Sequence, residues 1–149
     1  MPAPAQPPIG RTLALTAKDV SRAFDAALTA VGGSLPTWLI MISLQTRRLG
    51  TQRELAETVG IKPATLTHHL NAMEADGLVT RHRSADNRRV HDVRLSERGQ
   101  VLFHRLAAAA AAHDRRLRAG LGEEEIATLE RLLTRLRRNV TDHDPTEHP

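Results

Sequence analysis

Residues 51–96, TQRELAETVGIKPATLTHHLNAMEADGLVTRHRSADNRRVHDVRLS, decide the fold of this chain. Within them, apolar residues recur at helical spacing as far as Gly77, and the period changes after it. Thr51 begins one helix with the pattern of a capping box, and Gly60 ends it. Pro63 lies at the start of a second helix, where its fixed φ is tolerated. The stretch therefore predicts two helices joined by a short turn that contains a glycine.

A basic hairpin is predicted after these helices. Residues 78–83 and 90–95 are short β-prone runs, and turn-forming residues join them. Residues 81–94 hold five arginines and two aspartates, so most of the chain's formal net charge of +4 lies in this hairpin. Two helices, a glycine-bearing turn and a basic hairpin predict a winged helix-turn-helix over residues 34–96. In such modules the second helix enters the DNA major groove and the hairpin contacts the adjacent minor groove or the backbone.

Amphipathic helices are predicted on both sides of this module. In residues 11–33 and again in residues 97–140, apolar residues recur three and four positions apart. These apolar residues form a stripe along each helix, and a chain of this size has too few other elements to cover both stripes. The two regions are therefore expected to be the dimerisation helices of a homodimer. The six alanines of residues 107–112 indicate either high helix propensity or a close helix–helix approach. The predicted fold class is mainly α with a small β-hairpin wing.

The composition narrows the possible functions. The chain has 149 residues, with 21 Lys+Arg against 17 Asp+Glu, so we expect one domain with anionic partners, double-stranded DNA above all. The absence of cysteine excludes disulfides and thiol chemistry. Only 2% of residues are aromatic, which argues against stacking on single-stranded nucleic acid. Neither a nucleophile–base spacing nor a phosphate-binding glycine loop occurs, and the eight histidines lack metal-ligand spacing. We therefore expect no enzyme activity, cofactor or metal site.

The two ends of the chain differ in composition from the rest. Four prolines in the first eight residues predict a disordered lead-in over residues 1–10, and the polar residues 141–149 predict a flexible tail. Every apolar run is far shorter than the ~20 residues that span a bilayer. The start of the chain also lacks the order of regions typical of a signal peptide. These observations predict a cytoplasmic protein.

The second helix of the predicted module has two different faces. At about 100° per residue, Leu66, Leu70 and Met73 point to the core. The opposite face and its flanks are small and polar, as an approach to base edges requires, although such residues also suit a merely solvated surface. We expect the threonines to contact phosphates or thymine methyls and the asparagine to pair with adenine. The candidate DNA contacts of this helix are Ala64, Thr65, Thr67, His68 and Asn71.

The hairpin supplies candidate contacts of another kind. Arg83, Arg88 and Arg89 suit the negative potential of a narrow minor groove. The carboxylate of Asp86, in the predicted turn, is expected to hold Arg88 or Arg89 in place. The alternative is a charged loop that is only solvated.

Several segments, in their order and spacing, resemble the MarR family of transcriptional regulators. They are residues 55–56, 73–79, 81, 86–89 and 93–99, and the resemblance extends from about Leu13 to Val140. It implies a dimer formed by the terminal helices and two winged modules that read a palindromic operator. We expect a regulator of transcription, a repressor in preference to an activator. It also places DNA contacts at Ala64, Thr65, Thr67, His68, Asp86 and Arg88. His68 and His69 depart from the family, which usually has an arginine and an aliphatic residue there.

The resemblance further implies a small aromatic or phenolic effector that releases DNA. Its pocket is expected between the dimerisation helices and the winged module, with an arginine to neutralise a carboxylate. The candidates are Phe24, Trp38, Ile42 and Phe103, with Arg11, Arg22 or Arg47 as the cation. The apolar members are equally suited to the core. Two other functions stay open: an architectural DNA-binding protein without an effector, and an interaction module that has lost DNA binding.

Overall fold

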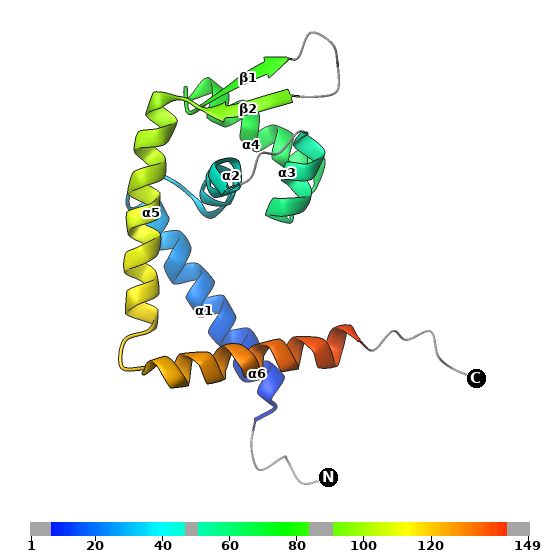
Figure 1. Cartoon of the computed structure of the whole chain (residues 1–149), viewed down its shortest axis with the longest axis vertical. Helices are drawn as coiled ribbons and strands as arrows, with labels where there is room; N and C mark the ends of the chain where they lie inside the picture. Colours follow the sequence, from blue (N-terminus) through cyan, green and yellow to red (C-terminus); the bar gives the residue numbers. More distant parts are fainter. Residues whose placement is uncertain (1–6, 47–50, 84–90, 143–149) are drawn as a thin grey trace, which may run out of the picture. The chain divides into compact units, whose positions relative to one another are not determined.

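The computed structural model describes residues 7–46, 51–83 and 91–142, and it confirms a mainly helical fold with one small hairpin (Figure 1). The chain divides into two compact units, residues 1–113 and 114–149. No helix in the described ranges is long and apolar enough to cross a membrane. The elements are α1 (Ile9–Thr29), α2 (Leu35–Thr46), α3 (Gln52–Val59), α4 (Pro63–Ala75), β1 (Val79–Arg83), β2 (His91–Leu95), α5 (Glu97–Leu117) and α6 (Glu123–Thr141).

The helices of the central module begin and end where the sequence predicts. The hydroxyl of Thr51 accepts a hydrogen bond from the N–H of Glu54 at 3.1 Å, which caps α3. Gly60 ends that helix with a φ of +78°, a conformation that glycine adopts without strain. Pro63 is in the first turn of α4, and Gly77 follows that helix with a φ of +72°. Local sequence signals therefore fix the helix–turn–helix geometry.

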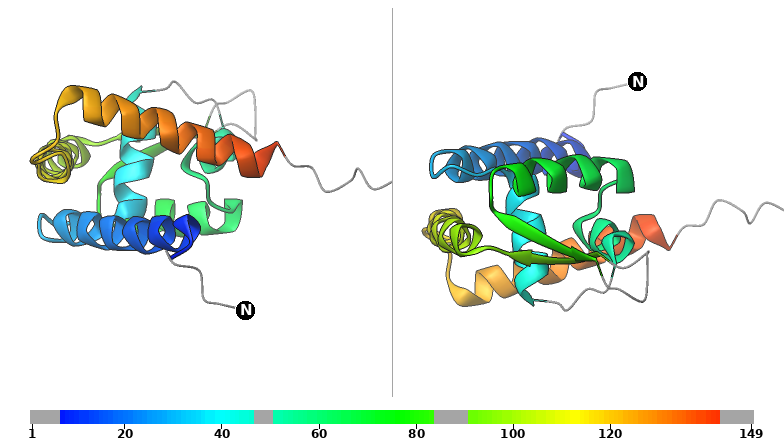
Figure 2. Two further views of the ribbon diagram at one scale, coloured as in Figure 1. Left: turned by 90° about the horizontal axis from the view of Figure 1, so that it is seen from below. Right: turned by 90° about the horizontal axis from the view of Figure 1, so that it is seen from above.

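Helix α2 lies at the centre of the first unit and organises its core. It contacts α1, α3, α4 and β2, and the views in Figures 1 and 2 show these elements around it. Ser34 caps it, because its hydroxyl accepts from the N–H of Thr37 at 3.3 Å. The core draws residues from five helices and from the start of the hairpin. Its largest fully buried side chains are Leu28, Ile40, Met41, Leu55, Leu66, Leu70, Val79 and Leu106.

The base of the hairpin is joined to α5 by a compact junction. Strands β1 and β2 are antiparallel, with Val79 opposite Leu95. The hydroxyl of Ser96 donates to the carbonyl of Gly77 and accepts from the N–H of Gly99 at 3.0 Å. The N–H of Ser96 donates to the carbonyl of Leu78 at 2.9 Å. One serine thus closes the hairpin and caps the following helix.

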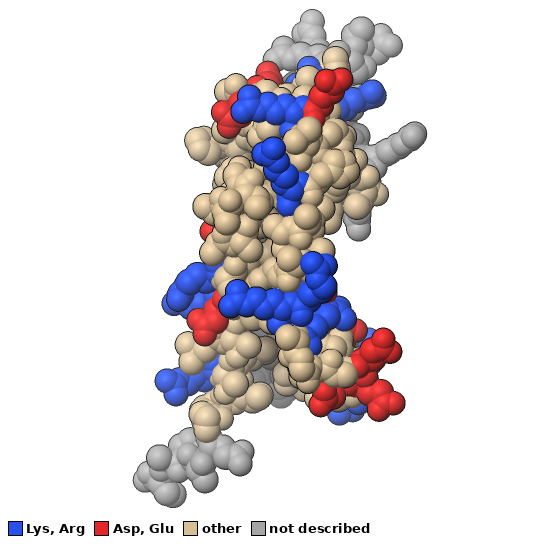
Figure 3. Space-filling view, turned by 90° about the vertical axis from the view of Figure 1, so that its left-hand side faces the viewer, with Lys and Arg blue, Asp and Glu red and all other residues tan. Residues whose placement is uncertain are grey.

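The α5 side of the first unit carries charges of both signs. Figure 3 shows basic and acidic side chains interspersed at the end of this face next to the hairpin. Farther along α5, the run Leu106–Ala112 has no charged residue. Beyond this run, Arg115 and Arg116 lie in the last turn of α5.

The first and last helices extend farther than expected. Helix α1 begins at Ile9, so the lead-in predicted for residues 1–10 is wrong for residues 9 and 10. The carbonyl of Pro8 accepts a hydrogen bond from the N–H of Arg11 at 3.0 Å. The helix therefore begins immediately after the last proline of the N-terminal group. Helix α6 extends to Thr141, whose hydroxyl donates to the carbonyl of Arg137 at 3.0 Å. The rest of the predicted lead-in and tail, residues 1–6 and 143–149, lies outside the described residues.

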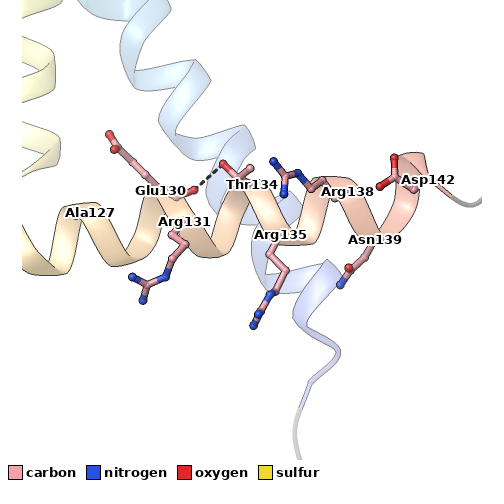
Figure 4. A pocket seen from close by; sticks show the side chains of 8 residues that line it. All are labelled: Ala127, Glu130, Arg131, Thr134, Arg135, Arg138, Asn139 and Asp142. Atoms are coloured by element: carbon pink, nitrogen blue, oxygen red, sulfur yellow. Dashed lines mark hydrogen bonds between the residues drawn. The ribbon is translucent and has the colours of Figure 1, made fainter.

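The second unit contains the end of α5 and the amphipathic helix α6. Its first turn carries Glu123, Glu124 and Glu125, where the helix dipole favours negative charge. Its polar side forms a shallow groove, and Figure 4 shows Arg131 and Arg135 extending from the same side of the helix. None of its residues is buried. Its large exposed apolar residues are Leu129, Leu132, Leu133 and Val140.

The junction at α5 gives a prediction about stability. A Cβ atom at Gly99 would overlap the backbone carbonyl of Leu78, so Gly99→Ala is expected to destabilise the protein by about 1–3 kcal/mol. Gly10 is the matched control, since it also lies in the first turn of a helix but has open space around it. Urea unfolding followed by circular dichroism checks both variants. Equal free energies of unfolding for the two variants would contradict the assigned close contact.

Candidate nucleic-acid interface

The two faces predicted for α4 are both present in the structure. Leu66, Leu70 and Met73 are buried against the rest of the first unit. The candidate contacts Ala64, Thr65, Thr67, His68 and Asn71 are all exposed. Helix α4 packs against α2, α3 and β1, which fix its orientation in that unit. The structure therefore places a small polar surface on the exposed side of the second helix of the motif.

The two threonines on this surface differ in their hydrogen bonding. The hydroxyl of Thr67 donates to the carbonyl of Pro63 at 3.0 Å, one turn earlier in the same helix. Its proton is therefore engaged, and the residue offers its methyl group and an acceptor oxygen. Within the described ranges, the hydroxyl of Thr65 makes no hydrogen bond. Thr65 is thus the threonine whose hydroxyl is available to donate to DNA.

The adjacent histidines lie in different environments, as expected. His68 is exposed, whereas His69 is partly buried. Their rings meet edge to face, with centroids 6.0 Å apart. Only His68 is therefore presented fully to the surface that carries Thr65 and Asn71.

A polar link that sequence reasoning missed connects the hairpin to α4. The Nη2 atom of Arg81 donates to Oδ1 of Asn71 at 2.9 Å. Its buried Nε lies 3.0 Å from Oε2 of Glu74, an ion pair that lacks the alignment of a hydrogen bond. Asn71, which is exposed on α4, therefore has one hydrogen-bond partner within the chain. The alternation of side chains along a strand could have indicated this contact. Arg81 lies two residues after the buried Val79, so both side chains are on the same face of β1.

The backbone of the hairpin is formed as predicted, but its tip lies outside the described residues. Arg83 pairs with His91 at the end of the described ladder. Asp86, Arg88 and Arg89 belong to the part that is not described. The DNA contacts expected of these four residues remain predictions from the sequence.

The apolar residues proposed for an effector pocket belong to the core of the first unit, and three of them stack on another ring. Trp38 and Phe103 stack with centroids 5.7 Å apart, and Phe24 stacks on His113 at 5.0 Å. Trp38 belongs to the buried core, and Phe24, Ile42 and Phe103 pack against it. These contacts give all four residues a structural role.

Two of the three cations proposed for the same pocket, Arg11 and Arg22, lie in the part of the chain that the structure describes. Arg11 lies on α1 almost four turns before Phe24, about 20 Å along the axis, so one small molecule cannot contact both in the same chain. Arg22 is exposed on α1. Arg47 lies outside the described residues.

Comparison with known proteins agrees with this arrangement of helices and hairpin. Residues 34–91 match the model of the MarR family. The transcriptional regulator PA3341 is 32% identical to the chain, with a TM-score of 0.73 and coverage of 91% of this chain and 100% of that one. The transcriptional repressor CouR, bound to a 23-mer DNA duplex, is 26% identical, with a TM-score of 0.78 and coverage of 88% and 93%. The MarR family protein Rv2887 of Mycobacterium tuberculosis, in complex with salicylic acid, is 27% identical, with a TM-score of 0.65 and coverage of 89% and 98%. The chain belongs to the MarR family of transcriptional regulators.

Proposed function

We propose that this regulator is a homodimeric, cytoplasmic repressor that binds a palindromic operator in double-stranded DNA. The observation that carries the proposal is the exposed polar surface of α4, joined through Arg81 to a hairpin rich in arginine. A helix of this kind fits the major groove, and an arginine-rich hairpin fits the adjacent minor groove. The relative CouR, itself a repressor bound to a DNA duplex, supports this mode of binding. Residues 34–96 are the proposed DNA-binding region.

The terminal helices are the proposed dimerisation surface, within residues 11–33 and 97–140. The apolar side chains of Leu13 and Leu15 on α1 and of Leu129 and Leu133 on α6 are exposed in the single chain. A second copy would bury them, and burial is favourable by ~25 cal/mol for each Å² of apolar surface. A two-fold dimer would also present two α4 helices to half-sites about one helical turn of DNA apart, which matches a palindrome.

A small aromatic or phenolic acid is the proposed effector that releases the operator. The relative Rv2887 binds salicylic acid, which supports this class of molecule. In this chain the ligand would have to enter among α1, α2 and α5, where the Trp38–Phe103 and Phe24–His113 pairs lie. Since both pairs already stack internally, binding requires at least one of them to open.

Footprinting on genomic fragments tests the proposed function. We expect protection of one or a few short palindromes, because α4 offers base-specific contacts in addition to charge. Uniform coating of all fragments would instead identify an architectural protein without an operator. Absence of protection at low salt would contradict DNA binding altogether.

Dimerisation through α6 is tested with the double variant Leu133→Asp, Leu136→Asp. Each buried unpaired carboxylate opposes association by several kcal/mol, so the variant is expected to sediment as a monomer with reduced stability. Asn139→Asp adds a charge to the polar groove of the same helix and should leave the dimer intact. A double variant that stays dimeric and equally stable would show that the interface lies elsewhere.

The separate roles proposed for α4, base discrimination, and for the hairpin, phosphate neutralisation, are tested by comparing two alanine variants. Arg88→Ala should weaken binding to all DNA sequences and lower the salt slope by about one, because a hairpin arginine mainly neutralises phosphate. Thr65→Ala should relax discrimination at particular base pairs by about 1–3 kcal/mol for each lost base contact. Binding titrations against operator and non-operator duplexes at several salt concentrations measure both effects. Identical profiles for the two variants would contradict this division.

A further inference from the structure

Arg81 gives the hairpin a second point of attachment to α4. The first is at the base of the hairpin, where the N–H of Leu78 donates to the carbonyl of Met73 at 2.8 Å. Arg81 lies three residues farther along the chain, roughly 10 Å away in an extended strand. There its Nη2 donates to Oδ1 of Asn71 at 2.9 Å, and its Nε lies 3.0 Å from Oε2 of Glu74. A single attachment leaves a hairpin free to pivot about its base, and the second one restricts that motion.

The second attachment is directional, unlike the apolar contacts of the hairpin. Val93 lies opposite Arg81 in the ladder and packs against the core. Apolar packing is non-directional, so it keeps the face buried without setting the angle between strand and helix. The guanidinium of Arg81 is planar and forked, and its two partners, Asn71 and Glu74, lie one turn apart on α4. Its side chain is only 17% exposed, so the charge is largely withdrawn from solvent.

The carboxylate of Glu74 is an unexpected group on a helix that is proposed to bind DNA. It is half exposed and lies one turn from Asn71, a candidate DNA contact. A carboxylate near phosphates opposes DNA binding, because like charges repel. The ion pair with Arg81 offsets this charge and keeps the guanidinium inside the protein. The contribution of Glu74 therefore lies in the orientation of the hairpin, and not in a contact with DNA.

We propose that Arg81 and Glu74 are positioning residues that set the direction of the hairpin relative to α4, so that both elements reach one half-site together. The inference rests on the proposed binding of an operator by these elements. When the pair is removed, DNA binding itself has to fix the hairpin, and that cost lowers the affinity. The pair thus supports binding without touching the operator.

Operator titrations with two single variants test the role of the pair in binding. Arg81→Met and Glu74→Ala are each expected to weaken operator binding by about three- to tenfold, the range for losing one hydrogen bond or partly buried ion pair. For Glu74→Ala, charge alone predicts the opposite, because the change removes a negative charge and frees a guanidinium. Asp76→Ala is the matched control, since it removes the same charge from an exposed position at the end of α4 and should not weaken binding. Unchanged or tighter binding by Glu74→Ala would overturn the proposal.

The direction of the hairpin is measured in the protein without DNA. The chain has no cysteine, so nitroxide labels can be attached at two exposed positions through Ala72→Cys on α4 and His82→Cys on β1. Labelled chains are mixed with an excess of unlabelled chains, so that no dimer carries two labelled copies. Electron paramagnetic resonance should give a narrow distribution of label distances in the wild-type background and a broader one with Arg81→Met, whereas Asp76→Ala keeps it narrow. An equally narrow distribution with Arg81→Met would overturn the proposal.

The two measurements separate this inference from the proposed function. Circular dichroism checks that each variant is folded, and Glu74→Ala is expected to fold because alanine is the best helix former. If the wild-type protein selects no operator, the proposed function fails, while the label distances still decide whether the pair fixes the hairpin. A broader distribution without loss of operator affinity would overturn the role of the pair in binding.

Discussion

The close approach of the first turn of α5 to the backbone of Leu78 is the constraint on which the rest of the first unit depends. Gly99 has no Cβ to keep the two apart, and Ser96 uses both its backbone and its hydroxyl to join them. The junction fixes the base of the hairpin relative to α4, because Leu78 also donates its N–H to the carbonyl of Met73 at 2.8 Å. The strand and the helix that are proposed to contact DNA thus share one anchored segment.

Much of this arrangement follows from signals within a few residues of sequence. The cap at Thr51, the glycines that end α3 and α4, and the buried stripe of Leu66 and Leu70 act locally, so they were predictable. The contact between Arg81 and Asn71 was not, because it depends on the angle at which β1 packs against α4. The structural role of the effector candidates was equally hard to predict, since apolar side chains that suit a pocket also stack on each other in a core.

The exposed surface of α4 and the hairpin differ in the kind of interaction they offer. The exposed α4 residues include threonines, an alanine and an amide, groups that distinguish bases but attract phosphate weakly. The arginines proposed to attract phosphate lie in the hairpin, residues 81–94. Arg81 uses its charge within the protein, where its Nε lies 3.0 Å from the carboxylate of Glu74. The sequence alone does not distinguish this arginine from the others of the hairpin.

The absence of any buried residue on α6 has a consequence for the dilute protein. An isolated helix of nineteen residues is only marginally stable in water, and most helices depend on tertiary packing. In the proposed dimer, that packing comes from a second copy, so each chain acts as a stabilising ligand for the other. The melting temperature then rises with protein concentration. On dilution, α6 of such a dimer is expected to be the first helix exposed to proteases, which would couple the lifetime of the regulator to its own amount.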